Sequence, residues 1–289
     1  MDTASRGWLN GFAGMLIFSG SLPATRVAVA DFDPVFLTAA RATIAGVLAL
    51  SALWLLRAKG PTPAQAVPLA LVAVGVVIGF PLLTALALQH VTSAHSVVFI
   101  ALLPLSTAAF GVLRGGERPR PMFWIFSVLG SLLVIGFAAA QGLTASPAGD
   151  LLMLAAILVC GLGYAEGAKL SRTLGGWQVI CWALVLSLPA MLALALWRLP
   201  VSVAGIGAPA WVGLGYVSVF SMLIGFVFWY RGLAQGGIAA VGQLQLLQPL
   251  FGLALAAGLL REPVSPVMLA VTVAVIGCVA GARHFSRAR

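Results

Sequence analysis

The chain is dominated by apolar runs of about 20 residues, the length that an α-helix needs to cross a bilayer. Hydrophobic residues make up 61% of the sequence and charged residues only 8%, whereas about a quarter of the residues in a soluble domain are charged. Lipid offers no hydrogen bonds to the backbone, so only helix bundles and closed barrels span it. The runs do not alternate polar and apolar residues as barrel strands do. The sequence therefore predicts an all-α integral membrane protein.

Turn-forming residues divide the apolar sequence into ten predicted transmembrane helices. They span residues 7–29, 35–56, 66–88, 93–113, 122–140, 149–170, 177–197, 209–231, 238–259 and 265–283. The first run, followed by Ala28-Val29-Ala30, also resembles a signal peptide with its cleavage site. We expect it to be retained, because Arg26 precedes that site and removal of the run would leave two unequal halves.

A pattern of proline, glutamate and proline occurs twice, at a spacing of 145 residues. The first copy is Pro104, Glu117 and Pro121, and the second is Pro249, Glu262 and Pro266. The chain is therefore predicted to contain two repeats, residues 1–145 and 146–289. Five helices per repeat is an odd number, so the second repeat enters the membrane inverted relative to the first. A site between inverted repeats can open to either side of the membrane.

The distribution of basic residues predicts the orientation. With the N-terminus inside, twelve Lys and Arg residues lie on the inner side and four on the outer side. This bias predicts a multi-pass protein with both termini in the cytoplasm. The formal charge of +9 does not predict nucleic-acid binding, because the basic residues are scattered singly at the ends of apolar runs.

The two matched prolines lie within apolar runs. Proline removes one backbone hydrogen bond and displaces the carbonyl four residues earlier, here that of Ile100 for Pro104 and that of Gln245 for Pro249. Each proline is either a static kink or a working hinge, and the duplication favours the hinge. His95 opens the fourth predicted helix and is a candidate gate residue, although a cap-like role at the interface is the favoured alternative.

Polar side chains of the ninth predicted helix are the first candidates for substrate binding. Gln245 and Gln248 are three positions apart and share one face, whereas Gln243 points elsewhere. A buried glutamine offers two donors and an acceptor, which suit the carboxylate or amine of a zwitterion. The alternative is an interhelical hydrogen bond that only fastens the bundle.

Aromatic and hydroxyl groups at similar depth complete the predicted substrate-binding residues. Phe80 and Thr84 form an i,i+4 pair beside Pro81, Phe99 lies in the fourth helix, and Tyr164 lies in the sixth. Simple packing is the alternative for the two phenylalanines. Tyr164 is the stronger candidate, because a buried phenol needs a hydrogen-bond partner.

Charged residues within the spans are few. Arg41 is a functional candidate by default, although its place near the outer end favours an ion pair with Asp31 or Asp33. No carboxylate lies at mid-depth, and the nearest, Glu166, is close to the cytoplasmic end with Lys169 one turn away. A proton-coupled exporter of cations needs such a carboxylate. The sequence therefore favours a neutral or zwitterionic solute without obligatory proton coupling.

Enzymatic and metal chemistry are not predicted. The sequence contains no H-E-x-x-H, Walker A or G-x-S-x-G motif, so we expect no enzyme and no cofactor. His90 and His95 are five positions apart and do not share a helix face for metal binding. The expected partners are a small-molecule substrate and membrane lipid.

The predicted spans, the duplicated pattern, and Asp33-Pro34 followed by Arg41 resemble the EamA-type members of the drug/metabolite transporter superfamily. The resemblance covers essentially the whole chain, and it is strongest to the YddG-type aromatic amino-acid exporters of the bacterial inner (plasma) membrane. It implies a basket of ten helices around a central cavity, lined by the third, fourth, eighth and ninth helices, which flex near Pro104 and Pro249. It also implies export of aromatic and other apolar amino acids.

Together these patterns predict a secondary transporter that exports amino acids by alternating access. The alternatives are a carrier for another class of small metabolite or for drugs, and a membrane scaffold that transports nothing. A carrier is expected to show saturable flux of its substrate, whereas a scaffold is not. The sequence leaves the oligomeric state open.

Overall fold

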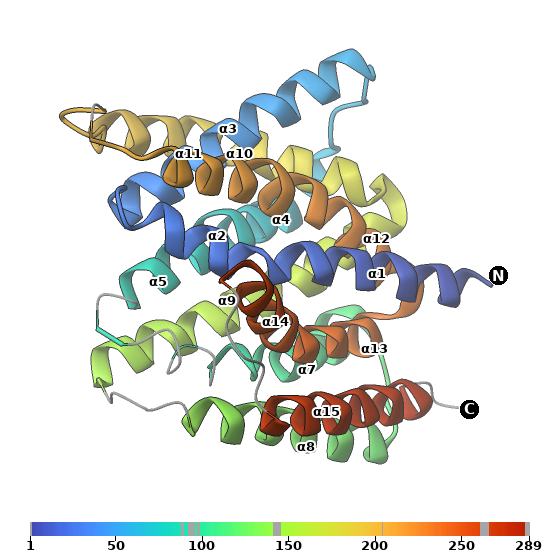
Figure 1. The fold of residues 1–289 in the computed structure, drawn as a ribbon. Helices are drawn as coiled ribbons and strands as arrows, with labels where there is room; N and C mark the ends of the chain where they lie inside the picture. The colour runs from blue at the N-terminus through green and yellow to red at the C-terminus, as the bar shows by residue number, and fades with distance from the viewer. Residues whose placement is uncertain are drawn as a thin grey trace.

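The computed structural model describes residues 2–87, 90–91, 96, 99–140, 146–203, 205–260 and 266–286. Within these residues every regular element is helical, and the helices form one bundle (Figure 1). The start of α1 and the end of α15 lie at the same end of the bundle, here called the terminal end (Figure 1).

The elements of the first half are α1 (Thr3–Ser19), α2 (Ser21–Ala28), α3 (Pro34–Leu55), α4 (Pro63–Val72), η1 (Ala73–Gly79), α5 (Phe80–Ala87), α7 (Leu103–Gly115) and α8 (Pro121–Ala139). Those of the second half are α9 (Pro147–Leu174), α10 (Gly176–Trp197), α11 (Ala208–Tyr216), η2 (Val217–Ile224), α12 (Gly225–Gly236), α13 (Ile238–Gly242), η3 (Gln243–Leu247), α14 (Gln248–Leu260) and α15 (Pro266–Phe285).

Five helical stretches are long and apolar enough to cross a membrane. They are Pro34–Leu55, Pro63–Ala87, Pro147–Leu174, Gly176–Trp197 and Ala208–Gly236. Large apolar side chains such as Leu48, Val67 and Leu186 are exposed on the outside of the bundle, as expected where lipid is the solvent. The prediction of an all-helical protein with apolar spans is thus confirmed. The number of ten crossings stays a prediction, because the other predicted spans are shorter or interrupted.

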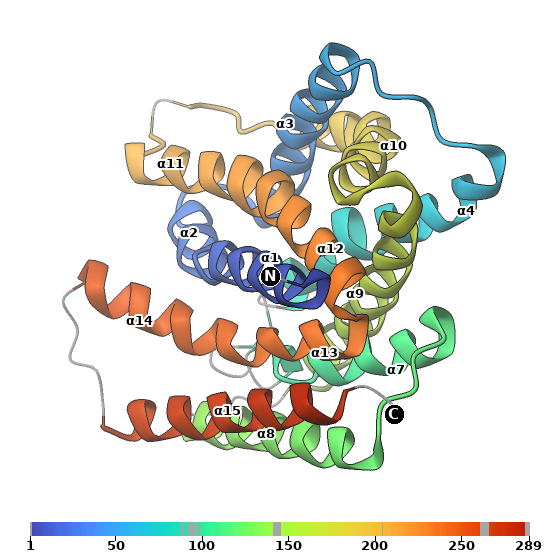
Figure 2. The ribbon, with the colours of Figure 1, turned by 90° about the vertical axis from the view of Figure 1, so that its right-hand side faces the viewer.

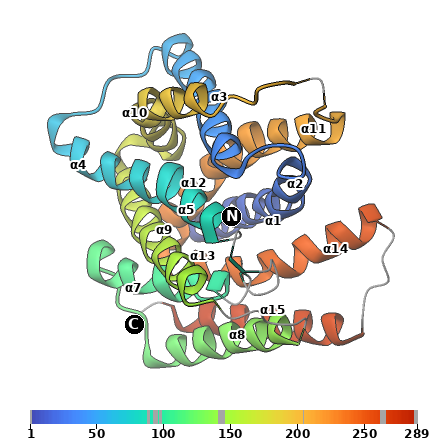
Figure 3. The same cartoon turned by 90° about the vertical axis from the view of Figure 1, so that its left-hand side faces the viewer.

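Helices that occupy equivalent places in the two halves pack against each other. Figures 2 and 3 view the bundle from its two ends and show α3 beside α10 at one edge and α8 beside α15 at the opposite edge. The contact of α1 with α12 has its counterpart in the contact of α9 with the α4–η1–α5 stretch. This exchange of equivalent helices is the packing expected of a duplicated five-helix unit.

Glycines hold α1 against α12. A Cβ atom built on Gly7 would lie 2.3 Å from the backbone nitrogen of Gly236, and one on Gly232 would lie 2.5 Å from the backbone nitrogen of Gly11. The two backbones are therefore in direct contact, which only small residues permit. The pairs Gly7/Gly11 and Gly232/Gly236, each at helical spacing, thus serve close helix packing.

The third predicted helix of each half contains a π-helical segment at the same place. In η1 the N–H of Phe80 donates to the carbonyl of Gly75, and in η2 the N–H of Gly225 donates to that of Phe220. Each bond reaches back five residues instead of four, and the two bonds are 145 positions apart. Such segments are rare and frequent at functional sites. The sequence analysis did not predict them.

The matched prolines start helices instead of bending them. Pro104 lies in the first turn of α7 and Pro249 in the first turn of α14, which follows the 3₁₀ segment η3. Proline is well tolerated there, because a first-turn N–H has no partner inside the helix. The predicted release of the Gln245 carbonyl is wrong, since this carbonyl accepts the N–H of Gln248. The hinge role of both prolines stays a prediction.

Candidate functional site

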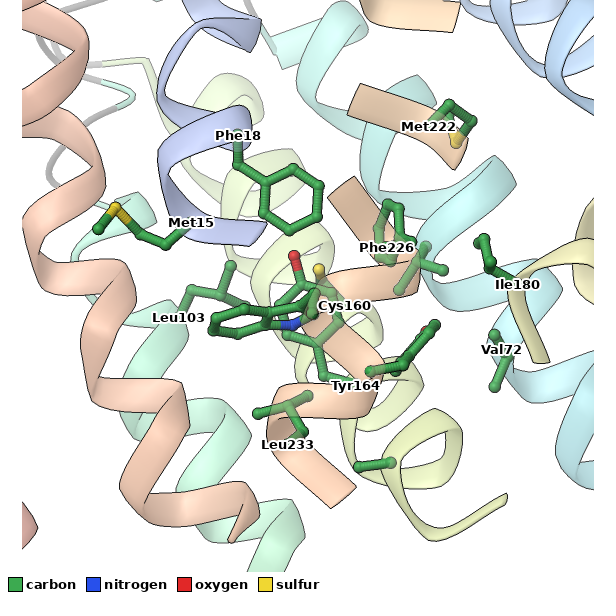
Figure 4. Packing of buried hydrophobic residues seen from close by; sticks show 14 of the residues in the cluster. Met15, Phe18, Val72, Leu103, Cys160, Tyr164, Ile180, Met222, Phe226 and Leu233 are labelled. Atoms are coloured by element: carbon green, nitrogen blue, oxygen red, sulfur yellow. The ribbon is translucent and has the colours of Figure 1, made fainter. Parts of the chain in front are cut away.

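Two of the predicted binding residues meet in the centre of the second half. The amide Nε2 of Gln245, on η3, donates to the hydroxyl of Tyr164, on α9, over 3.1 Å. Both side chains are buried, and Figure 4 shows Cys160 beside Tyr164. The hydrogen bond between Gln245 and Tyr164 joins the sixth and ninth predicted helices, and the Oε1 atom of Gln245 has no partner among the described residues.

Tyr164 and four other aromatic side chains are linked by ring contacts and form what we call the aromatic cluster. Its members are Phe18, Tyr164, Phe226, Trp229 and Tyr230. The ring centroids of Tyr164 and Trp229 lie 5.6 Å apart at 60°, and those of Phe18 and Phe226 lie 5.0 Å apart at 61°. Figure 4 shows Phe18, Tyr164 and Phe226 near Cys160 in the buried core. Edge-to-face contacts of this kind fix the ring orientations.

Several buried polar atoms in and beside the aromatic cluster have no hydrogen-bond partner in the part of the chain that the structure describes. They are Nε1 of Trp229, Oε1 of Gln243, Oε1 of Gln245 and Oγ1 of Thr107. Trp229 and Gln245 both contact Tyr164, and Thr107 lies against Gly242, next to Gln243. Natural proteins satisfy nearly all buried polar groups. One donor, two acceptors and a hydroxyl left open in one region therefore point to a ligand or to water.

Gln243, which was predicted to point elsewhere than Gln245 and Gln248, is enclosed within the bundle. Its side chain is fully buried, and its Nε2 atom makes only a 3.5 Å hydrogen bond to the carbonyl of Ala239. Every residue from Ile238 to Leu247 is buried. A segment enclosed on all sides has no outward face, so helical periodicity could not exclude Gln243.

The other predicted binding residues that the structure describes make no side-chain hydrogen bond to Gln245. Gln248, Phe80 and Thr84 are partly exposed, and the hydroxyl of Thr84 donates to the carbonyls of Phe80 and Pro81. Phe99 packs at the edge of the apolar core. His95 and Glu262 lie outside the described residues.

The sequence analysis missed the aromatic partners of Tyr164. Trp229 lies two positions before the end of its predicted span, residues 209–231, where a tryptophan is typical of the membrane interface. The helical stretch Ala208–Gly236 continues past that predicted end, and Trp229 is fully buried within it. Its position in the sequence therefore did not distinguish Trp229 from the tryptophans near the other predicted helix ends.

Two charged residues have surroundings other than those predicted. Arg41 makes no ion pair with Asp31 or Asp33 in the part of the chain that the structure describes. Asp31 instead accepts the N–H of Gly207, and Asp33 caps the first turn of α3. The predicted pairing is wrong because both carboxylates already serve backbone donors, which gain most from a charged acceptor.

Glu166 also differs from the prediction. It is fully buried, and its Oε1 atom accepts the Nε–H of Arg114 on α7, while Lys169 one turn along α9 is exposed. The carboxylate is thus paired across the two halves, and its Oε2 atom has no partner among the described residues.

An all-helical bundle with long apolar spans, duplicated packing and a polar site enclosed between the halves defines a class, the multi-pass membrane transporters. Residues 5–138 and 147–282 both match the EamA-like transporter family. The chain belongs to this family.

Similar proteins are named as transporters. The chain is 68% identical over 287 residues to the uncharacterized transporter YdeK of Bacillus subtilis, covering 99% of this chain and 100% of that protein. It is 25% identical over 219 residues to the uncharacterized inner membrane transporter YedA of Escherichia coli, covering 74% and 69% of the two chains. A solved structure described as the crystal structure of a protein matches with a TM-score of 0.81 at 21% identity, over 98% of both chains. This last likeness shows the fold alone.

Proposed function

We propose that the protein is a secondary carrier that exports amino acids, aromatic and other apolar ones first, by alternating access and without obligatory proton coupling. The observation that carries the proposal is the set of unpartnered polar atoms beside the aromatic cluster. A zwitterion complements them, because its carboxylate can accept from the Trp229 indole and its ammonium can donate to the Gln243 and Gln245 oxygens. An aromatic side chain then packs on the rings of the cluster.

The proposed arrangement has ten crossings, in two inverted repeats at residues 1–145 and 146–289. The terminal end faces the cytoplasm, in keeping with the bias of Lys and Arg towards that side. The π segments η1 and η2 support a rocking mechanism, because they interrupt the regular α-helical hydrogen bonding at equivalent positions of both halves. Pro104 and Pro249, each at the start of a helix, are proposed as further hinge positions.

Transport by purified protein in liposomes tests this function. Labelled phenylalanine, tryptophan, methionine and threonine are offered with and without a pH gradient. We expect saturable uptake of the first three that is indifferent to the gradient. Rates that follow the gradient would exclude the uncoupled mechanism. Saturable transport of purines or drugs only would favour the alternative carriers, and no saturable flux would favour the scaffold.

Replacing Trp229 by phenylalanine should separate binding from packing. The substitution keeps a ring in the aromatic cluster but removes the indole N–H, so we expect the apparent affinity for phenylalanine to fall about 5- to 10-fold with little change in melting temperature. Trp182→Phe is the matched control, since the Nε1 atom of Trp182 is also unpartnered but its ring makes no contact with Tyr164. If both variants had the same apparent affinity for phenylalanine, Trp229 would not be part of the binding site.

A further inference from the structure

The last turn of α7, in the first half, is tied to the second half at the terminal end. The Nε–H of Arg114 donates to Glu166 on α9. The guanidinium of Arg172, near the end of α9, lies 3.8 Å from the carboxylate of Glu117. Figure 2 shows α7, α9 and α13 meeting on this side of the bundle.

Glu117 makes the strongest of these contacts. Its Oε1 atom accepts the N–H of Ile238 over 2.6 Å, and its Oε2 atom accepts the N–H of Ala239 over 2.7 Å. These are the first two amides of α13, whose own N-cap residue is Gly237, with no side chain and a φ of 96°. A charged acceptor on two free amides forms short and strong hydrogen bonds. The helix in the second half is thus capped by a residue from the first.

The capped helix leads directly to the candidate site. The five residues of α13 are followed without interruption by η3, which carries Gln243 and Gln245. The contacts of Glu117 therefore fix the position of the segment that presents these two amides. A movement of α7 away from α13 would release that segment at the terminal end.

Water can reach these contacts from outside. A cavity of about 430 Å³ is lined by Glu117, Arg118, Arg172 and the turn from Ala234 to Gly237, together with Ala240 and Ser286. The side chains of Arg114 and Arg172 are 49% and 43% exposed. Solvent at this rim can replace the hydrogen bonds of Glu117 as they break, so these contacts are suited to reversible opening.

We propose that Glu117 is the latch of a gate at the terminal end, with the Arg114–Glu166 pair as its second contact. This proposal rests on the proposed function, in which the two halves separate at one end to release substrate. With the latch closed, α7 is held on α9 and α13, and the segment with Gln243 and Gln245 is shut off from this side. Opening the gate breaks both contacts and exposes the start of α13.

The test needs no substrate, so it can fail independently of the amino-acid proposal. Hydrogen exchange of the backbone amides is compared in wild type and in Glu117→Gln, which keeps the shape but loses the charge. We expect the amides of Ile238 and Ala239 to exchange at least tenfold faster, with α1 and α3 unchanged. Arg118→Gln is the matched control, because Arg118 lines the same rim and makes no hydrogen bond or ion pair to α13 among the described residues.

Accessibility distinguishes a gate from a cap that serves only stability. A cysteine introduced by Ala240→Cys lines the cavity, and the native cysteines are buried. We expect a membrane-impermeant maleimide to label it at least fivefold faster when Glu117→Gln is added, and only from the terminal side of vesicles. The neutral pair Arg114→Gln with Glu166→Gln should also increase labelling, and it provides a second variant if Glu117→Gln does not fold. Unchanged labelling in every folded variant, or faster exchange throughout the chain, would overturn the proposal.

Discussion

Replacing Gln245 by leucine is expected to reduce transport of phenylalanine at limiting substrate by about 10- to 100-fold. Leucine removes the amide that we propose to bind the zwitterion, and a hydrogen bond to a charged group contributes about 1.5–3 kcal/mol. The side chain is buried and its Oε1 atom has no hydrogen-bond partner among the described residues, but leucine also removes the hydrogen bond that Nε2 donates to Tyr164. Initial rates in liposomes, measured over a range of substrate concentrations, give the effect.

Gln248→Leu is the matched control. Gln248 has the same side chain one turn away, but it is partly exposed and starts α14. We expect its transport rate to stay within about twofold of wild type, as for most surface substitutions. Equal losses in both variants would assign the effect to the ninth helix as a whole, and wild-type rates in Gln245→Leu would place the site elsewhere.

Gly232→Ala should strongly destabilise the fold. The added Cβ would lie 2.5 Å from the backbone nitrogen of Gly11 and 2.7 Å from its Cα atom, and a backbone cannot move aside as a side chain can. Overpacking of this kind costs about 1–3 kcal/mol or more. We expect the melting temperature in detergent to fall by about 5 °C or more, with a larger aggregated fraction on size exclusion.

The control for this substitution is Gly215→Ala, on the same helical stretch. A Cβ at Gly215 meets nothing within 4 Å. Alanine favours helix over glycine by about 0.8–1.0 kcal/mol, so the melting temperature should stay constant or rise slightly. Similar decreases in melting temperature in the two variants would mean that the contact between α1 and α12 is looser than the structure shows.

The fold class was accessible from the sequence because lipid imposes simple rules. Long apolar runs, turn residues between them and a repeated Pro…Glu…Pro pattern are enough to predict helices in two related halves. The interruptions within the helices could not be predicted from the sequence. Nothing in the residues Ala73–Gly79 or Val217–Ile224 distinguishes a π turn from an α turn, since the difference lies in which carbonyl each N–H reaches.

The site was predictable only in part. Tyr164 and Gln245 were identified because polar groups in apolar runs need partners, and the structure joins them directly. Gln243 and Trp229 were missed because burial on every side is a property of the tertiary fold. The partner of Glu166 was assigned along its own helix, whereas the structure takes Arg114 from the other half. The spacing of residues along one helix cannot show whether a charged side chain pairs with a residue one turn away or with a residue that the tertiary fold brings close.

The glycine contact between α1 and α12 has a consequence for synthesis of the chain. Gly232 follows Gly7 by 225 positions, so at about 5–20 residues per second the ribosome needs roughly 11–45 s to supply the partner of the first helix. During that time the glycine face of α1 lacks the partner that it has in the folded protein. Nascent chains stalled before α12 should therefore be degraded faster than chains stalled after it, and α1 completes its packing among the last helices although it is made first.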